Sequence, residues 1–226
     1  MKHYFKTVLK IKSSIVLLFF SLFCLALSFI RILISKDFLF LFLIWNLFLA
    51  FIPWFLSSIL MICDIKKTTV FFIILAVWIF FFPNAPYILT DIIHLKIAAP
   101  KYRWIDLILI LSYTFCGLFY GFTSLFFTEK ALVKMLKVKH PLIFSVIILY
   151  LAGFGIYLGR FLRWNSWDLV ANLQKILCDV FDRVANPFEH WQVWAFTFAL
   201  GTLLNLLYLT YRSFNPSNQK LNIRNN

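Results

Sequence analysis

Charged residues are scarce in this chain, since Asp, Glu, Lys and Arg make up 14% of its 226 residues while hydrophobic residues make up 62%. So few polar side chains cannot cover a water-soluble globule of this size, which leaves lipid as the main solvent. The four cysteines are scattered without a CxxC pair or a zinc-type histidine spacing, so they indicate neither a zinc site nor a disulfide framework. Internal repeats and low-complexity tracts are also missing from the sequence.

Long apolar runs are present instead, at about residues 14–34, 38–62, 68–83, 105–127, 141–159 and 191–211. A helix of roughly 20 residues crosses a hydrocarbon core of about 30 Å. The run at 68–83 is the shortest, and Pro83 is expected to end it. The runs predict an all-α fold, a polytopic transmembrane helical bundle of about six spans over residues 14–211. Residues 1–13 form a basic N-terminus and residues 212–226 a polar tail.

The distribution of positive charge predicts the orientation. With six spans, thirteen Lys and Arg residues fall on the side of the two termini and nine on the other side. The positive-inside rule therefore predicts that both termini are cytoplasmic. The net charge of +13 is dispersed along span ends without a basic stripe, so we expect anionic membrane lipids as partners and no nucleic acid. Protein partners cannot be read from the sequence.

A first polar cluster follows the third run, in residues 83–94 (PNAPYILTDIIH). Asn84 is expected to cap a new helix, because Pro86 would then occupy its first turn. An α-helical period of about 100° per residue places Tyr87, Asp91 and His94 on one face. Asp91 and His94 are then suited to act as an acid–base pair or to ligate a metal. The alternative is a local ion pair of Asp91 beside an interfacial histidine, because two ligands are too few for a metal site.

A second polar cluster follows the fifth run, in residues 160–168 (RFLRWNSWD). If a helix continues from residue 156 to 168, Arg160, Arg163, Trp164, Trp167 and Asp168 share one face. Two guanidinium groups beside two indoles are typical of an anion clamp. The alternative is interfacial decoration of a span end, which also uses Arg and Trp.

An amphipathic pattern follows that cluster. Apolar positions between residues 169 and 184 fall on one side of a helix, opposite Lys175, Asp179 and Asp182. The pattern predicts an outer-face interfacial helix, lying on the outer leaflet and ended by Asn186 and Pro187.

Polar and small residues also occur within the spans. Asn46 and Asp106 lie in the outer parts of the second and fourth spans, where an amide or a carboxylate usually faces the bundle interior. The pairs Gly117 with Gly121 and Gly155 with Gly159 indicate close helix packing. If the fourth and fifth spans pack on each other, Asp106 is expected to approach Arg160.

An ordered set of motifs resembles the DUF1361 family of uncharacterised bacterial integral membrane proteins. The motifs are WNLFLAFIP at 45–53, FPNAPYILTDIIHL at 82–95, WID at 104–106 and GIYLGRFLRWNSWD at 155–168. The resemblance covers about residues 40–211 and implies a multi-pass protein of the bacterial plasma membrane, but no reaction. It marks ten polar residues: Asn46, Asn84, Tyr87, Asp91, His94, Asp106, Arg160, Arg163, Asn165 and Asp168.

Two functions are compatible with these residues if both clusters lie at one membrane face. The first is recognition of an anionic lipid or an envelope precursor. Its predicted ligand-binding residues are Asn46, Asn84, Tyr87, Asp106, Arg160, Arg163, Trp164, Asn165 and Trp167. The second is a membrane-embedded transferase or hydrolase acting on a lipid-linked substrate, with Asp91, His94 and Asp168 as catalytic residues. The sequence favours the first function, leaves catalysis open and identifies no cofactor.

Overall fold

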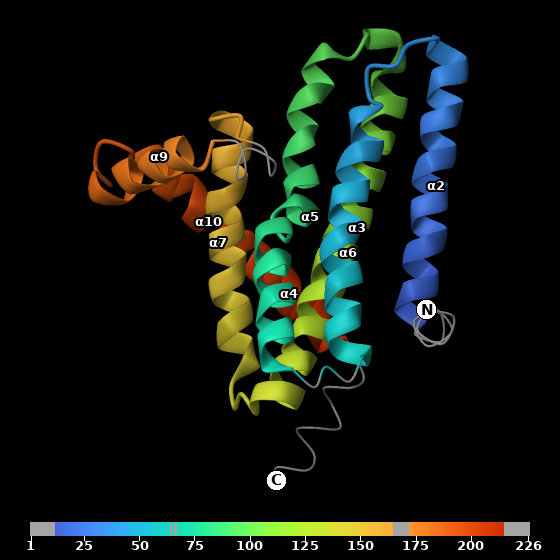
Figure 1. The fold of residues 1–226 in the computed structure, drawn as a ribbon. Coiled ribbons are helices and arrows are strands. Elements are labelled where there is room, and N and C mark those ends of the chain that lie inside the picture. The colour runs from blue at the N-terminus through green and yellow to red at the C-terminus, as the bar shows by residue number, and fades with distance from the viewer. Residues whose placement is uncertain (1–11, 64, 66, 165–171, 215–226) are drawn as a thin grey trace. The chain divides into compact units, whose positions relative to one another are not determined.

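Each of the six apolar runs forms a helix or helical segment long and apolar enough to cross a membrane. The computed structural model of the chain describes residues 12–63, 65, 67–164 and 172–214, and this part contains helices and no strand. The long helices are α2 (Lys12–Ser35), α3 (Phe42–Ile62), α4 (Thr68–Phe81), α6 (Arg103–Leu136), α7 (Pro141–Phe161) and α10 (Trp191–Ser213), as Figure 1 shows. The predicted all-α polytopic bundle is confirmed.

The third candidate span is composite and extends over Thr68–Ile97. After α4 the chain forms a single turn, α5 (Asn84–Tyr87), and then the 3₁₀ helix η1 (Ile88–Ile97), followed by the short η2 (Pro100–Tyr102). The predicted restart after Pro83 is present, but most of it has 3₁₀ instead of α geometry. A 3₁₀ helix repeats every three residues, so Asp91 shares its row with Ile88 and His94, and Tyr87 lies on a different row.

Helix α6 extends further than its apolar run. The fourth apolar run ends at about residue 127, whereas α6 continues to Leu136, with Lys137 in a left-handed conformation at its end. Residues 128–136 contain no Gly or Pro, and most of them are good helix formers. Ala131 and Leu132 are buried, which adds packing to this favourable helix propensity.

The chain divides into two compact units, residues 1–139 and 140–226. In the first unit α6 is the central helix, and α2, α3, α5 and η1 pack against it. The end of α2, the start of α3, η1 and the start of α6 lie at one end of this unit (Figure 1). The buried Trp78 indole of α4 donates a hydrogen bond of 2.7 Å to Ser124 Oγ of α6.

The second unit contains α7, α9 (Leu173–Ala185) and α10, and α7 packs against α10. The amphipathic segment does form a helix, α9, which lies crosswise to α7 (Figure 1). The condition for one shared face in the second cluster, a helix from residue 156 to 168, is not met in its described part, because α7 ends at Phe161. Arg163 has a φ of 62°, and this left-handed conformation turns the chain out of the helix.

Candidate functional site

Asn46, Asp91 and His94 come together at one end of the first unit. The Asn46 amide of α3 donates a hydrogen bond of 2.8 Å to Asp91 Oδ2, and Asp91 Oδ1 lies 4.0 Å from His94 Nε2. Asp91 and His94 are one 3₁₀ turn apart, so their side chains project from the same edge of η1. Two elements, α3 and η1, therefore build one cluster from three of the predicted site residues.

Exposure differs sharply within this cluster. The Asp91 side chain is 1% exposed, whereas that of His94 is 34% exposed. The Phe42 ring packs edge-on against the imidazole, with ring centres 5.0 Å apart. A buried carboxylate behind a partly exposed imidazole can orient that ring and balance its charge when it is protonated. The arrangement is therefore suited to acid–base chemistry at His94, with Asp91 and Asn46 in supporting positions.

Two glycines of α6 allow α5 and the start of η1 to approach closely. A methyl group on Gly117 would lie 2.8 Å from Ile88 Cδ1 and 2.9 Å from the Ala85 carbonyl oxygen, and one on Gly121 would lie 3.0 Å from Ala85 Cβ. Thr114 Oγ1 of α6 also donates a hydrogen bond of 3.2 Å to the Ile88 carbonyl. The prediction of close packing is confirmed for Gly117 and Gly121, whose near neighbours are α5 and the first residue of η1.

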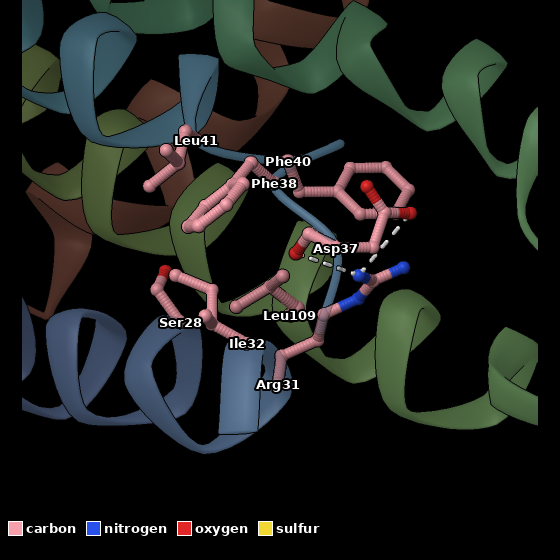
Figure 2. Close-up of a pocket in the computed structure, with 8 residues that line it drawn as sticks. All are labelled: Ser28, Arg31, Ile32, Asp37, Phe38, Phe40, Leu41 and Leu109. Atoms are coloured by element: carbon pink, nitrogen blue, oxygen red, sulfur yellow. Dashed lines mark hydrogen bonds and ion pairs between the residues drawn. The ribbon is translucent and has the colours of Figure 1, made fainter. Parts of the chain in front are cut away.

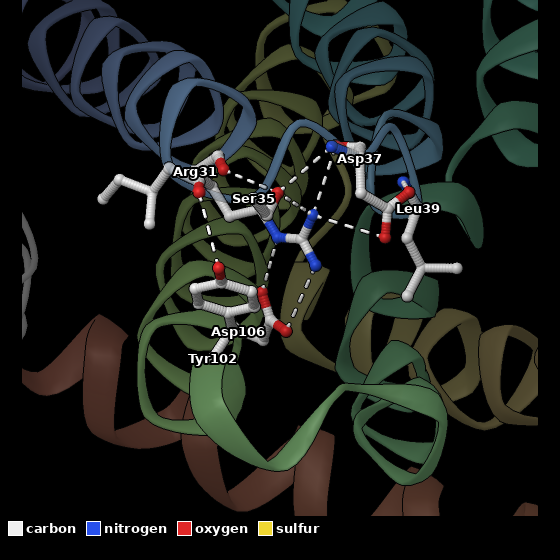
Figure 3. A network of polar contacts seen from close by, with 7 residues as sticks. Arg31, Ser35, Asp37, Leu39, Tyr102 and Asp106 are labelled. Carbon is white, nitrogen blue, oxygen red and sulfur yellow. Dashed lines mark hydrogen bonds and ion pairs between the residues drawn. The ribbon is translucent and has the colours of Figure 1, made fainter.

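Asp106 forms a buried ion pair with Arg31 near the end of α2 (Figure 3). Arg31 Nε donates to Asp106 Oδ1 at 2.8 Å and Nη2 donates to Oδ2 at 3.4 Å. The two side chains are 3% and 0% exposed, respectively. Both carboxylate oxygens thus accept hydrogen bonds from Arg31. The approach of Asp106 to Arg160 stays a prediction, because the two residues belong to different units.

The Nη1 donors of Arg31 are also engaged. Its Nη1 donates to Ser35 Oγ and to the Asp37 carbonyl, the latter at 3.1 Å, and lies 3.6 Å from Asp37 Oδ2 (Figure 3). Its guanidinium also lies over the Phe40 ring, 5.3 Å from the ring centre. Sequence reasoning missed Arg31 as a site residue because an arginine near a span end resembles an ordinary interfacial charge.

A small pocket adjoins this ion pair (Figure 2). Its lining consists of Ser28, Arg31, Ile32, Asp37, Phe38, Phe40, Leu41 and Leu109. The cavity volume of about 10 Å³ is room for about one water molecule. We conclude that the Arg31–Asp106 pair holds α2 against α6.

Asn84 and Tyr87 lie on α5, between α4 and η1. The Asn84 amide donates a hydrogen bond of 2.9 Å to the Phe81 carbonyl at the end of α4. The prediction that Asn84 caps the following helix is wrong, because Pro83 is the N-cap of α5 and no side chain bonds there. Tyr87 is half-buried on α5. The two residues belong to the junction between α4 and η1.

In the second unit, Arg160, Arg163 and Trp164 form the corner that follows α7. Arg160 lies in the last turn and is half-buried, and Arg163 is exposed. The backbone N–H groups of Leu162 and Trp164 both donate to the Leu158 carbonyl, at 3.2 Å each. The Trp164 indole donates a hydrogen bond of 2.8 Å to Asp179 Oδ2 of α9. The corner is therefore fixed both to the end of α7 and to α9.

Three predicted site residues, Asn165, Trp167 and Asp168, lie outside the described residues. Within the part of the chain that is described, no group of three or more His, Cys, Asp or Glu side chains is placed to hold a metal ion. The joint site of the two polar clusters stays a prediction.

A comparison with protein-family models found one described as "Protein of unknown function (DUF1361)", which matches residues 45–207. Comparisons with curated proteins and with solved structures found no match.

Proposed function

The chain belongs to the DUF1361 family of proteins of unknown function, and we propose that it recognises an anionic lipid or envelope precursor at the membrane face where α7 ends. The observation that carries this proposal is the hydrogen bond of 2.8 Å between the Trp164 indole and Asp179. This bond joins the corner that carries Arg160 and Arg163 to an amphipathic helix, so the arginines are held beside an element suited to a lipid surface.

The chemistry of the corner fits an anionic headgroup. Guanidinium groups bind phosphate or carboxylate oxygens through paired N–H donors. The half-buried Trp164 ring supplies an apolar surface for the adjoining part of the ligand. Asn46, Asn84 and Asp106 have partners in the first unit, so in this proposal they support the fold there instead of shaping the pocket.

The proposal also includes the location. We place the protein in the bacterial plasma membrane with both termini in the cytoplasm, which puts the Arg160 corner at the outer leaflet. The excess of Lys and Arg on the side of the termini, thirteen against nine, supports this orientation.

Lipid retention by purified protein tests the proposal. Protein extracted in native nanodiscs is expected to enrich one class of anionic lipid or precursor over the bulk membrane. Arg160→Gln or Arg163→Gln should weaken that retention about tenfold, the effect of losing one hydrogen bond to a charged group. Lys139→Gln is the matched control, because it removes the same charge just before the other end of α7. Equal retention by wild-type protein and both arginine variants would refute the recognition site.

A second candidate function is supported by the first unit. The cluster of Asn46, Asp91 and His94 is suited to a membrane-embedded transferase or hydrolase acting on a lipid-linked substrate. His94 would be the general base because it is the exposed member, and Asp91 would orient it.

Product formation would distinguish the two functions. Purified protein is incubated with polyprenyl phosphate and phosphatidylglycerol, with and without Mg²⁺, and products are followed by mass spectrometry. Catalysis predicts turnover that His94→Gln abolishes, whereas recognition alone predicts binding of the intact lipid. A His94→Gln protein as active as the wild type would exclude His94 as the base.

A further inference from the structure

Helix α9 exposes a continuous apolar stripe. Leu173, Leu177, Phe181 and Val184 follow one another at spacings of four, four and three residues and are 50%, 57%, 74% and 54% exposed. Phe188, just beyond the helix, is 93% exposed. Spacings of three and four place these side chains on one side of an α-helix. An apolar stripe of this length on a helix generally marks a binding surface.

The position of α9 in the chain restricts what can cover the stripe. Helices α7 and α10 are consecutive candidate spans, ending at Phe161 and beginning at Trp191. A segment between two consecutive spans begins and ends at the same membrane face. Phe161 and Trp191, at the two helix ends, are themselves 55% and 62% exposed. In the sequence, the apolar stripe of α9 therefore lies between two apolar residues that border the bilayer.

Polar contacts hold the opposite side of α9 to its own unit. Besides the Trp164–Asp179 bond, His190 Nε2 lies 2.8 Å from Asp182 Oδ2. The Trp194 indole of α10 donates a hydrogen bond of 3.1 Å to the Arg183 carbonyl. These contacts turn the polar side toward the ends of α7 and α10, so the apolar side faces away from the unit.

We infer that the apolar stripe of α9 docks into the boundary between headgroups and acyl chains of the bilayer that α7 and α10 cross. The helix lies parallel to the membrane surface and inserts Phe181 and its apolar neighbours among the lipids. Residues 173–190 carry two basic and three acidic side chains, so attraction to anionic lipid does not drive the docking. Burial of apolar area is the driving force, and docking is independent of lipid charge.

This independence separates the inference from the proposed headgroup recognition. Binding at Arg160 and Arg163 requires an anionic ligand, whereas docking of α9 proceeds equally in neutral phosphatidylcholine. Substitution of both arginines would abolish binding of the anionic ligand and leave the docking of α9 unchanged.

Photocrosslinking from within α9 tests the docking. Benzoylphenylalanine replaces Phe181 in one protein and Lys175, on the polar side, in another. In nanodiscs of phosphatidylcholine alone and in discs with added phosphatidylglycerol, position 181 should form lipid adducts several-fold more often than position 175. Adducts to a second copy of the chain or to another protein at position 181, or equal lipid labelling at both positions, would overturn the inference. Labelling restricted to anionic discs would also overturn it.

Release of the helix gives an independent measurement. Phe181→Asp should raise the rate of tryptic cleavage after Lys175 in phosphatidylcholine discs by about tenfold to a hundredfold, the factor for leaving one phenylalanine out of an apolar environment. Cys178→Asp is the matched control, because Cys178 is exposed on α9 outside the stripe. Equal cleavage of the Phe181→Asp and Cys178→Asp proteins would contradict docking through the stripe.

Discussion

Loss of the Asp106 carboxylate should destabilise the attachment of α2 more than any other single polar substitution in the first unit. Asp106→Asn leaves the Arg31 guanidinium, 3% exposed, without the carboxylate that accepts two of its hydrogen bonds. Removing one partner of a buried ion pair costs about 3–5 kcal/mol. Asp37 stays 3.6 Å from Arg31 Nη1 and offsets part of the loss, so we expect about 3 kcal/mol. Denaturation of the purified protein with dodecyl sulfate, followed by tryptophan fluorescence, measures the change.

A double substitution separates the ion pair from the general effect of mutating α6. Arg31→Met with Asp106→Leu removes both charges and retains apolar volume, so its stability should lie near that of the wild type. Asp37→Asn is the second control, because the Asp37 side chain is 54% exposed and surface ion pairs contribute about 0–1 kcal/mol. If the double variant is as unstable as the sum of its single variants, the claim that a buried ion pair holds α2 is wrong.

Three further predictions concern α6, the polar cluster and α9. Gly117→Ala should destabilise the protein by about 1–3 kcal/mol in the same denaturation assay, because the new methyl group would overlap Ile88. A stability equal to that of the wild type would contradict the close approach of Ile88 to α6. Asn46→Ala should cost about 1–3 kcal/mol, because it removes a hydrogen-bond donor from buried Asp91, and Asn46→Asp should cost more; retained stability in both would argue against the contact. Hydrogen bonds from the Asn186 amide and from His190 lower the pKa of Asp182 below its usual 3.8. Their contribution to the stability of α9 is therefore present above about pH 4 and is lost as the pH falls through the lowered pKa. The protection of α9 amides relative to their intrinsic exchange rate should therefore fall in acid in the wild type, and this fall should be smaller in Asp182→Asn.

Composition and length predicted the spans well, because a membrane crossing requires little beyond about 20 apolar residues. The limits of α6 were less predictable, since its apolar run ends at about residue 127 although helix propensity favours continuation. The turn after α7 could not be predicted, because it depends on a left-handed Arg163, a conformation that is uncommon for residues other than glycine.

Contacts between distant residues were the least predictable part of the candidate site. Arg31 and Asp106 are 75 positions apart, so no local pattern connects them. A carboxylate inside an apolar run does indicate that a cation must lie nearby, and a search for that cation would have included Arg31. The 3₁₀ form of η1 was missed for a similar reason, since Gly117 and Thr114 of α6 contact its first residue and are distant in the sequence.

The winding of η1 also links the thickness of the bilayer to the geometry at His94. Ten residues of 3₁₀ helix extend about 20 Å, whereas the same residues as α-helix would extend about 15 Å. The fourteen residues of α4 extend only about 21 Å, so this crossing depends on η1 to reach the far interface. Rewinding η1 to fit a thinner membrane would rotate His94 by about 60° relative to Asp91, because three residues turn about 300° in an α-helix and about 360° in a 3₁₀ helix. The imidazole and the carboxylate therefore lie on one row only while this segment keeps its longer form, and an α-helical form would set them about 60° apart on the same face.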